Sequence, residues 1–446
     1  MSQPPNPHAP KPASVSADPS LSRRGFLGTT TLAAGVWLGG SSEGFESRSA
    51  LEKLNLAVIG IGGRGSANLG GVSKENIVAL CDVDDVRAGK AFDRFSKAKK
   101  FYDYRKLFDE MGNKIDGVVI STPDHTHFHI AHRAMSEGKH VYLEKPMAHN
   151  VWECRQLTNL AREKKLATQL GVQRHTIGNM HRTVELIQSG AIGNVTEVHC
   201  WIDSDRGLPQ LNKKENPIPS TLKYDLWLGP AKATMAYQPS VTPYGWRFYW
   251  DYGTGETGNF GCHILDIPYW SLDLKYPTRV GGSGGLANLK TTPKSMASWM
   301  EFPATEKRSA VKLHWSQAKG GPAILKEKGL PARGNNTLFI GDKGMLLCGF
   351  NQRTLLPEDD FQDFTTPDPF IPDSPGFHKE WIDACKGGKS ATCHFDYSGP
   401  MTETVLLGNV AFRSLGVFDW DSKNLKSSNQ IAQRMIKEDY AKGWEV

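Results

Sequence analysis

A short apolar segment that runs directly into a glycine-rich turn constrains the fold of this chain more than any other feature. Residues Leu54–Ile59 (LNLAVI) form the nearly continuous apolar run expected of a parallel strand that is covered on both faces. The next residues, Gly60-Ile61-Gly62-Gly63-Arg64-Gly65, match the spacing G-x-G-x-x-G. In that pattern the first glycine makes a tight turn, the second lets the backbone approach a pyrophosphate, and the third allows close helix packing. The segment predicts a strand, a phosphate-binding turn and a helix whose N-terminus faces an anion.

The context of this turn favours a dinucleotide cofactor, although chance matches are expected in a chain with 45 glycines. A second apolar strand, Ile77–Cys81, ends at Asp82, and the fingerprint places an acidic residue about twenty residues after the glycines. A carboxylate there accepts hydrogen bonds from the adenosine ribose and repels a 2′-phosphate, which favours NAD over NADP. Arg64 and Arg87 weaken that preference. Cofactor contacts are expected from Gly60, Ile61, Gly62, Arg64, Gly65 and Asp82.

Strands and helices continue to alternate after the turn. Helical patterns over Val86–Ala98, Tyr104–Met111 and through His132–Glu137 alternate with strands at Gly117–Ser121 and His140–Leu143. This alternation predicts an α/β fold with a doubly wound parallel sheet, whose ligand lies outside the carboxyl ends of the strands. Two motifs follow such ends, and from them we expect cofactor contacts by Thr122, Pro123, His127, Glu144 and Lys145.

Histidines and cysteines suggest no metal site. His125, His127 and His129 occupy alternate positions, which diverge on a helix, and no carboxylate or cysteine completes a ligand set. Contact with the cofactor or capping of the next helix is the preferred interpretation. Seven cysteines, an odd number without a C-x-x-C pair, predict buried thiols rather than disulfides or zinc ligands.

The first fifty residues are predicted to be a disordered leader with an export signal. Residues 1–20 are rich in Pro, Ser and Ala and are expected to be disordered. Ser22-Arg23-Arg24-Gly25-Phe26-Leu27 and the modestly apolar run to Gly40 resemble a twin-arginine export signal, the alternative being a chance Arg-Arg pair. The run is too short for a membrane anchor. We expect a periplasmic or otherwise exported protein that folds around a tightly held cofactor before export.

Several motifs together resemble the glucose-fructose oxidoreductase and inositol dehydrogenase (Gfo/Idh/MocA) family over about residues 54–446. They include the glycine turn, Glu144-Lys145-Pro146, Gly171-Val172-Gln173-Arg174, Trp246-Arg247, the run Gly258–Asp266, and the closing Tyr440–Trp444. The resemblance implies an NAD-binding Rossmann domain over residues 51–170 after a leader over residues 1–50. It also implies a substrate-binding and oligomerisation α/β domain over residues 171–446, with a mostly antiparallel open sheet and a return segment after Ser422. A homodimer or homotetramer is expected.

The resemblance also implies catalytic roles. It places Lys145 beside the nicotinamide and the substrate hydroxyl, and makes His263 the general acid or base. Asn259, His263, Asp266 and Trp270 have spacings that put them on one face of a helix. Without the resemblance, His263 would be interpreted as a core histidine with a partner. Sugar dehydrogenases of the family usually carry an aspartate where this chain has Asn259. An amide cannot ionise to support His263, but Asn259 is kept as a catalytic candidate because it can orient the ring or bind a sugar hydroxyl.

Further candidates come from the second domain. Arg174, Trp246, Arg247 and Asp266 are expected to contact the substrate. The aromatic residues of 246–252 suit either stacking on a sugar ring or a core or oligomer contact. Gly281–Gly285 and Gly329–Asn336 are expected to be loops. The net charge of +6 is spread along the chain without a long Lys/Arg block, which argues against a nucleic-acid partner.

Three functions are compatible with these features. The first is an NAD-dependent oxidoreductase that acts on a carbinol of a sugar, polyol or glycoside. The second is an NAD-dependent glycoside hydrolase that works by transient oxidation, elimination and re-reduction. The third is a non-catalytic sensor of sugars or nucleotides on the same fold.

Overall fold

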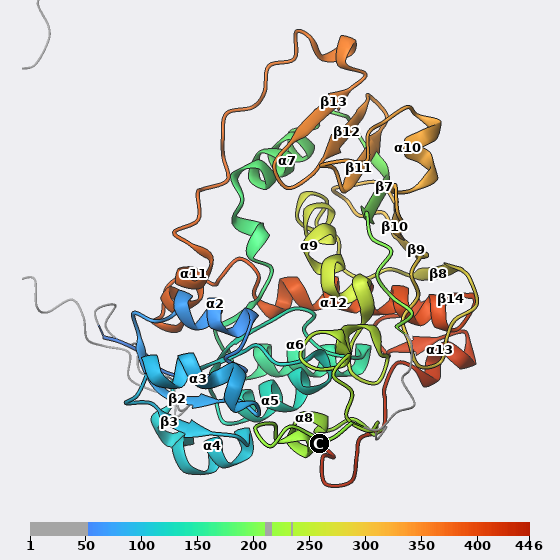
Figure 1. Ribbon diagram of the computed structural model, residues 1–446. Helices are drawn as coiled ribbons and strands as arrows, with labels where there is room; N and C mark the ends of the chain where they lie inside the picture. Colours follow the sequence, from blue (N-terminus) through green and yellow to red (C-terminus); the bar gives the residue numbers. More distant parts are fainter. Residues whose placement is uncertain (1–51, 210–215, 233–234) are drawn as a thin grey trace, which may run out of the picture. The chain divides into compact units, whose positions relative to one another are not determined.

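The computed structural model describes residues 52–209, 216–232 and 235–446 (Figure 1). The predicted export signal, including Arg23 and Arg24, lies outside the described residues. Within the described part, no helix is both long enough and apolar enough to cross a membrane.

The first sheet is the predicted doubly wound parallel sheet. Its order is β3-β2-β1-β4-β5-β6, and every neighbouring pair is parallel. This is the strand order of the two-half dinucleotide-binding fold. The side chains of Leu56, Val58 and Val119 are fully buried, as continuous apolar strands covered on both faces require. The strands are β1 (Asn55–Ile59), β2 (Asn76–Cys81), β3 (Lys99–Phe101), β4 (Gly117–Ile120), β5 (His140–Leu143) and β6 (Thr168–Leu170).

Five helices connect these strands, namely α2 (Arg64–Gly71), α3 (Asp85–Arg94), α4 (Tyr104–Met111), α5 (Asp124–Ser136) and α6 (Val151–Glu163). Asp84 caps α3 by accepting bonds from two backbone N–H groups, and Asn150 and Glu153 form a capping box at α6. The helix expected over Val86–Ala98 ends earlier, at Arg94, because the chain turns there into the short strand β3. Helix α5 already begins at Asp124, so the histidine motif belongs to its first turns.

The second sheet confirms the predicted, mostly antiparallel architecture. Its order is β13-β12-β11-β7-β10-β9-β8-β14-β15, and only the β7–β10 pair is parallel. Buried and partly buried residues alternate along β9 and β10, so one face of the sheet forms a core. The strands are β7 (Val195–Ile202), β8 (Arg279–Gly284), β9 (Met296–Phe302), β10 (Val311–Gln317), β11 (Thr337–Gly341), β12 (Met345–Cys348), β13 (Arg353–Leu356), β14 (Val417–Asp421) and β15 (Lys426–Ser427).

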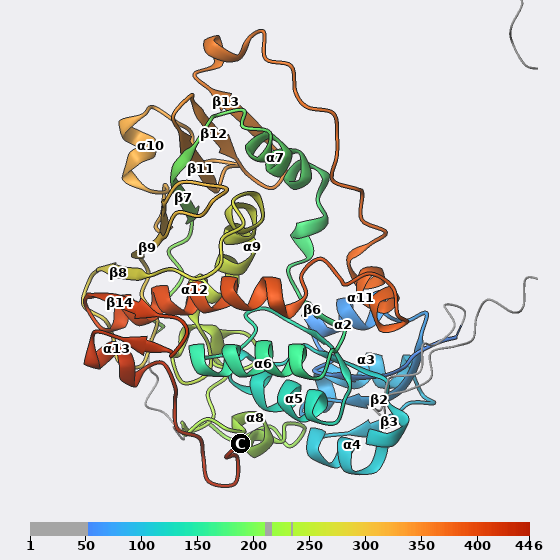
Figure 2. The ribbon, with the colours of Figure 1, turned by 180° about the vertical axis from the view of Figure 1, so that it is seen from behind.

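The helices after β6 are α7 (Gly178–Gln188), α8 (Tyr224–Leu228), α9 (Gly255–Ser271), α10 (Ala323–Glu327), α11 (Phe377–Cys385), α12 (Phe395–Arg413) and α13 (Gln430–Arg434). Helices α9 and α12 pack together; α9 contacts β7, and α12 contacts β8 and β9. Helix α12 also runs beside α6 of the first domain in both views (Figures 1 and 2). The bidentate ion pair of Arg155 on α6 with the buried Glu403 on α12 joins these helices, with N–O distances of 2.6 and 2.7 Å.

One expected loop is a strand. Gly281–Gly285 was expected to be a loop, but Arg279–Gly284 forms β8 between β9 and β14. A Cβ atom at Gly281 would lie 2.4 Å from Trp299, and one at Gly282 would lie 2.3 Å from the backbone N of Phe412. The glycines therefore let this strand pass close to its neighbour and to α12. The loop prediction was wrong because it assumed that clustered glycines form a turn.

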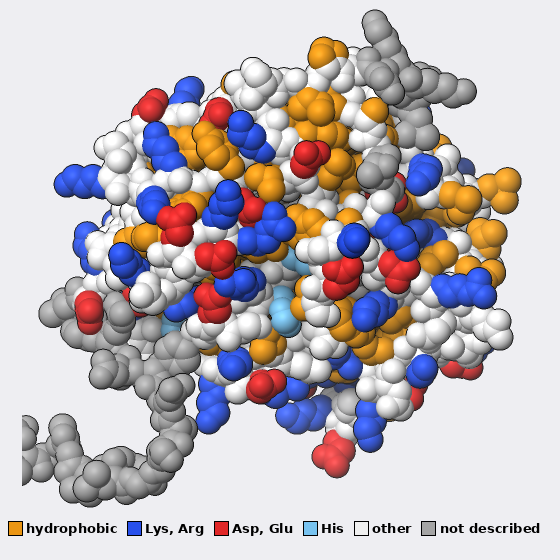
Figure 3. All heavy atoms as spheres, turned by 90° about the horizontal axis from the view of Figure 1, so that it is seen from below, with side chains coloured by type: hydrophobic (Ala, Val, Ile, Leu, Met, Phe, Trp, Pro, Cys, Tyr) orange, Lys and Arg blue, Asp and Glu red, His pale blue; other side chains and the backbone are white. Residues whose placement is uncertain are grey.

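The cysteine prediction is confirmed. All seven cysteines are buried free thiols. Figure 3 shows basic and acidic side chains interspersed over the face that lies at the bottom of Figure 1.

Candidate active site

A cavity of about 710 Å³ lies at the carboxyl ends of the first sheet. The ends of β1, β2, β4 and β5 contribute to its wall, and residues of the second domain close it. Of the predicted site residues, those that line it are Gly60, Gly62, Arg64, Asp82, Thr122, Pro123, Glu144, Lys145, Arg174, Trp246, Arg247, Asn259 and His263. Ile61, Gly65, His127 and Asp266 do not line it.

The glycine turn needs glycine for steric reasons. Gly60 has a φ of 77°, and a Cβ there would lie 2.7 Å from the backbone O of Ser121. A Cβ at Gly65 would lie 1.8 Å from the backbone O of Gly60. Gly65 therefore sits beneath the turn and lets α2 approach it. The backbone of this segment forms a cradle of the kind that accommodates a pyrophosphate.

Asp82 fastens the turn from the end of β2. Its Oδ2 accepts hydrogen bonds from the backbone N–H groups of Ile61 at 2.8 Å and Gly62 at 3.2 Å. Burial raises the pKa of Asp82, and these backbone hydrogen bonds oppose that rise. The Arg87 guanidinium lies close to Gly62 and Gly63. The carboxylate predicted to bind ribose thus also holds the loop in place.

Glu144 joins three segments at the cavity wall. Its Oε1 accepts hydrogen bonds from Arg64 Nε at 3.1 Å, Asn68 Nδ2 at 2.9 Å and Gln173 Nε2 at 2.7 Å. Arg64 and Asn68 belong to α2, and Gln173 follows β6 at the domain junction. The carboxylate is therefore committed to holding the site together, and it neutralises Arg64.

Lys145 points from the end of β5 toward α9. Its Nζ donates hydrogen bonds to the backbone O of Asn259 at 2.7 Å and to Asn259 Oδ1 at 2.9 Å. Burial lowers the pKa of Lys145, while Glu144 and Asp124 partly offset this effect. An ammonium has three N–H donors. One donor is therefore left for a substrate oxygen in the cavity.

His263 lies one helical turn after Asn259. Its side chain is 9% exposed, and its Nδ1 has no hydrogen-bond partner among the described residues. Burial lowers the pKa of His263 well below its usual value, and the positive charges of Lys145, Arg174 and Arg64 lower it further. The imidazole is therefore neutral at neutral pH, and it can accept a proton without first losing one.

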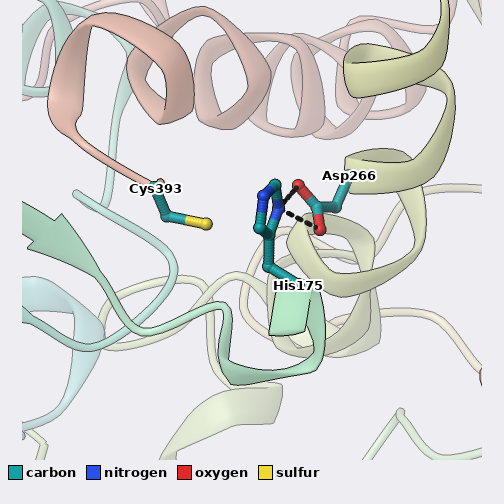
Figure 4. A group of neighbouring side chains, drawn as sticks. All are labelled: His175, Asp266 and Cys393. Atoms are coloured by element: carbon teal, nitrogen blue, oxygen red, sulfur yellow. Dashed lines mark hydrogen bonds and ion pairs between the residues drawn. The ribbon is translucent and has the colours of Figure 1, made fainter. Parts of the chain in front are cut away.

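Asp266 was expected to contact the substrate, but the structure places it elsewhere. It is fully buried, and its two oxygens accept from His175 Nδ1 at 3.0 and 2.9 Å (Figure 4). Its Oδ1 also accepts a 2.6 Å hydrogen bond from Tyr397. With Cys393, the pair forms a group of potential metal ligands whose ligand atoms lie within 4.8 Å of one another. Because these hydrogen bonds already satisfy the carboxylate, we interpret it as a brace between α9 and the segment that carries Arg174.

The histidines of α5 do not line the cavity and instead bond backbone O atoms of other segments. His127, predicted as a cofactor contact, instead bonds the backbone O atoms of Pro146 at 2.7 Å and Thr122 at 2.9 Å. His125 bonds the backbone O of Trp227, and His129 bonds that of Trp444. The three rings therefore serve different partners and do not converge. A second group of potential metal ligands, Glu197, His199 and His314, lies on the second sheet.

The aromatic segment divides between the cavity and a small core. Trp246 lines the cavity and also belongs to a hydrophobic cluster, in which Tyr249 and Tyr252 pack with Trp227. The core interpretation therefore holds for most of the segment. Arg247 lies over the rings of Tyr244 and Trp246.

Sequence reasoning missed several lining residues, namely Asp124, Gln173, Tyr244 and Trp444. Asp124 accepts hydrogen bonds from the backbone N and the Oγ1 of Thr254 at 3.2 and 2.7 Å. Asp124, Gln173 and Trp444 lie inside motifs that the sequence analysis had identified, so their positions could have marked them as site residues. Tyr244 had no such signal.

Comparison with known proteins found two matching family models. Residues 54–172 match the family model described as "Oxidoreductase family, NAD-binding Rossmann fold", and residues 186–281 match "Oxidoreductase family, C-terminal alpha/beta domain". The inositol 2-dehydrogenase of Salmonella typhimurium is 30% identical over 152 residues, 33% of this chain and 45% of that protein. A glycosyl hydrolase family 109 protein of Solibacter usitatus is 31% identical over 201 residues, 39% of this chain and 44% of that protein.

The chain thus spans less than half the length of these two curated relatives. The fold is shared with the WlbA dehydrogenase of Bordetella pertussis, solved in complex with NADH and UDP-GlcNAcA, at a TM-score of 0.59 and 14% identity. That match covers 83% of this chain and 99% of the other. The first matched segment is thus similar to the NAD-binding Rossmann domain of the Gfo/Idh/MocA oxidoreductase family, and the second is similar to its C-terminal α/β domain.

Proposed function

We propose that this protein is an NAD-dependent oxidoreductase that acts on a carbinol carbon of a sugar, polyol or glycoside. One observation carries the proposal. Lys145 from the first domain and His263 from the second line the same cavity as the glycine turn. A proton donor to oxygen and a neutral proton acceptor therefore share one cavity with a dinucleotide cradle.

The residues at the cradle fit a dinucleotide. Side chains at Gly60 and Gly65 would collide with the backbone, and the cavity extends from the turn to His263. Gly62 and the start of α2 would hold the pyrophosphate, and Asp82 the adenosine ribose. The carboxylate of Asp82 supports NAD, whereas the nearby Arg87 would favour a 2′-phosphate. A bound nicotinamide would supply the acceptor for the hydride that leaves the carbinol carbon.

The chain's own groups would handle the oxygen and its proton. Lys145 donates its free N–H to the substrate oxygen and so stabilises negative charge that develops there. His263 is neutral and so can take the hydroxyl proton, but its burial and the charge of Lys145 make it a weak base. Asn259 is a positioning residue, since its two oxygens fix the direction of the Lys145 ammonium. No carboxylate assists His263, so its basicity depends on what else occupies the cavity.

The relative in glycosyl hydrolase family 109 favours a second candidate function. In that scheme a sugar carbon is oxidised, the neighbouring C–H is deprotonated, the leaving group departs, water adds, and the hydride returns. The cofactor is then unchanged over a cycle. Such a cycle would suit export through the predicted twin-arginine signal, because free NAD is scarce outside the cytoplasm. We also propose that the second sheet builds a homodimer or homotetramer, as the resemblance implies.

A single experiment separates these candidates. The purified protein is loaded with NAD and mixed with pooled sugars, polyols and glycosides, while absorbance and reducing-sugar release are recorded. A reduced-nicotinamide band that persists supports the oxidoreductase. Release of sugar without a persistent band supports the hydrolase. If neither signal appears with any carbohydrate, and ligands still bind, the non-catalytic sensor replaces both proposals.

A further inference from the structure

Charges around the catalytic groups are unevenly paired. Arg64 forms an ion pair with Glu144 at 3.1 Å, and Arg206 forms one with the buried Glu256 at 2.6 Å. Arg174 and Arg247 line the cavity, yet neither forms an ion pair within the described part of the chain. The substrate half of the cavity therefore holds two guanidinium groups without a carboxylate partner.

Arg174 packs against an aromatic ring and has no other side-chain partner among the described residues. Its guanidinium lies 3.8 Å from the centre of the Phe350 ring, and it makes no hydrogen bond to any residue that the structure describes. Burial lowers the pKa of Arg174. A guanidinium has five N–H donors. Those of Arg174 are thus free to meet a ligand.

Arg247 is held in a similar way. It donates one hydrogen bond, of 3.2 Å, to the backbone O of Tyr244, and it lies 4.5 and 4.2 Å from the ring centres of Tyr244 and Trp246. Its charge lowers the pKa of Lys145, so the two cations are close enough to repel each other. Two carboxylates favour the charged form of Arg247, but Asp124 is hydrogen-bonded to Thr254, and Glu256 is paired with Arg206.

The resulting electrostatic field is positive at the catalytic histidine. The charged groups that shift the pKa of His263 are Lys145, Arg174 and Arg64, and all of them lower it. Partly buried charges are costly unless they are paired. Aromatic rings that hold both guanidiniums fix their planes before a ligand arrives, which reduces the entropy lost on binding. This arrangement is what a preformed anion site requires.

We propose that the substrate is an anionic carbohydrate, whose carboxylate, phosphate or sulfate group is bound by Arg174 and Arg247. This inference rests on the proposed function and adds the substrate's charge to it. Guanidinium groups bind such oxyanions through paired N–H donors. The cofactor pyrophosphate is not the anion that Arg174 and Arg247 would bind. The glycine turn, Arg64 and Arg87 lie at the pyrophosphate end of the cavity.

The test compares glucosides that differ in the group at carbon six and in its charge. The NAD-loaded protein is assayed with a methyl glucoside, the matching methyl glucuronide, and a glucoside that carries a phosphate or a sulfate at carbon six. We expect kcat/KM for at least one anionic compound to exceed that of the neutral glucoside by about 10- to 100-fold, as a charge-assisted hydrogen bond allows. The carboxylate, phosphate and sulfate arms identify the source of the charge.

Variants assign the effect to the two arginines. Arg174→Met and Arg247→Met should each lower kcat/KM for the preferred anion by about 10- to 100-fold more than kcat/KM for the neutral glucoside. Arg333→Met, in an exposed loop, is the matched control and should change neither. Binding of reduced nicotinamide, followed by fluorescence, should be preserved in all three variants and shows that they are folded.

Two results would overturn the inference. One is a neutral glucoside that is preferred over every anion, and the other is an equal loss for neutral and anionic sugars in the arginine variants. If no compound is turned over, the proposed function fails, and calorimetry of the same sugars with the NAD-loaded protein decides the charge question. Anion binding that Arg174→Met abolishes would then sustain this inference, and absence of such binding would reject it.

Discussion

Replacing Gly65 by alanine tests the cradle directly. The added Cβ would lie 1.8 Å from the backbone O of Gly60, where ordinary contact begins at 3.4 Å, so the start of α2 must retreat by roughly 1.6 Å. Overpacking of this kind costs about 1–3 kcal/mol of stability. Loss of one charge-assisted hydrogen bond to the pyrophosphate would cost a further 1.5–3 kcal/mol of binding free energy, or about 10- to 150-fold in Kd.

Gly70→Ala is the matched control on the same helix. A Cβ there meets nothing within 4 Å, and alanine is up to about 1 kcal/mol better than glycine inside a helix. The assays are fluorescence titration of the cofactor-free protein with NADH, and urea unfolding. We expect Gly65→Ala to lose affinity and stability, and Gly70→Ala to keep both. A Gly65→Ala protein that binds NADH as tightly as the wild type would refute the steric argument and the placement of the cofactor.

Three further predictions concern other groups. Lys145→Met should abolish turnover while NADH still binds, because the ammonium acts on the substrate oxygen; kcat and the NADH Kd measure the two effects. Arg155→Met should cost about 3–5 kcal/mol of unfolding free energy, because it strands the fully buried Glu403 carboxylate. Burial alone would lower the pKa of His149, but the carboxylates of Glu438, 3.2 Å away, Glu153 and Asp124 together raise it to about 9. The resulting stabilisation of about 2–4 kcal/mol should be fully present below about pH 6.5 and lost as the pH rises through about 9, which urea unfolding at several pH values measures.

Each of these predictions has a clear control. Arg162→Met removes an exposed ion pair with Asp396 and should cost less than about 1 kcal/mol. His149→Gln should remove most of the loss of stability between pH 6.5 and 9. Full turnover by Lys145→Met, equal costs for the two arginine variants, or a pH dependence that survives in His149→Gln would each contradict the corresponding assignment.

Local patterns predicted most of the first sheet, because a buried strand followed by glycines or by a helix leaves its mark within a few residues. Strand β3 escaped notice because only Phe101 of its three residues is buried. Strand β8 was concealed by glycines that serve close packing rather than a turn. In both cases a partner distant in sequence decides the structure.

The candidate site was also predicted only in part, because local sequence patterns place a residue on an element but do not reveal its distant partners. Helical spacing correctly placed Asn259, His263 and Asp266 on one helix, but it could not reveal that the last of these meets His175 and Tyr397 instead of the cavity. Likewise, strand-end position brought Lys145 to the site, whereas the two backbone O atoms that hold His127 come from separate loops. Which groups a polar side chain meets is a tertiary property, and spacing along the chain does not contain it.

Transfer of deuterium from substrate to cofactor tests the central claim most directly. The NAD-loaded protein is mixed with a carbohydrate substrate that is deuterated at its ring carbons, and the bound nucleotide is recovered during the first turnover and analysed by mass spectrometry. The account predicts deuterium on the nicotinamide ring, whether the net reaction is oxidation or hydrolysis. Turnover of the sugar with a nucleotide that never acquires the label would contradict it.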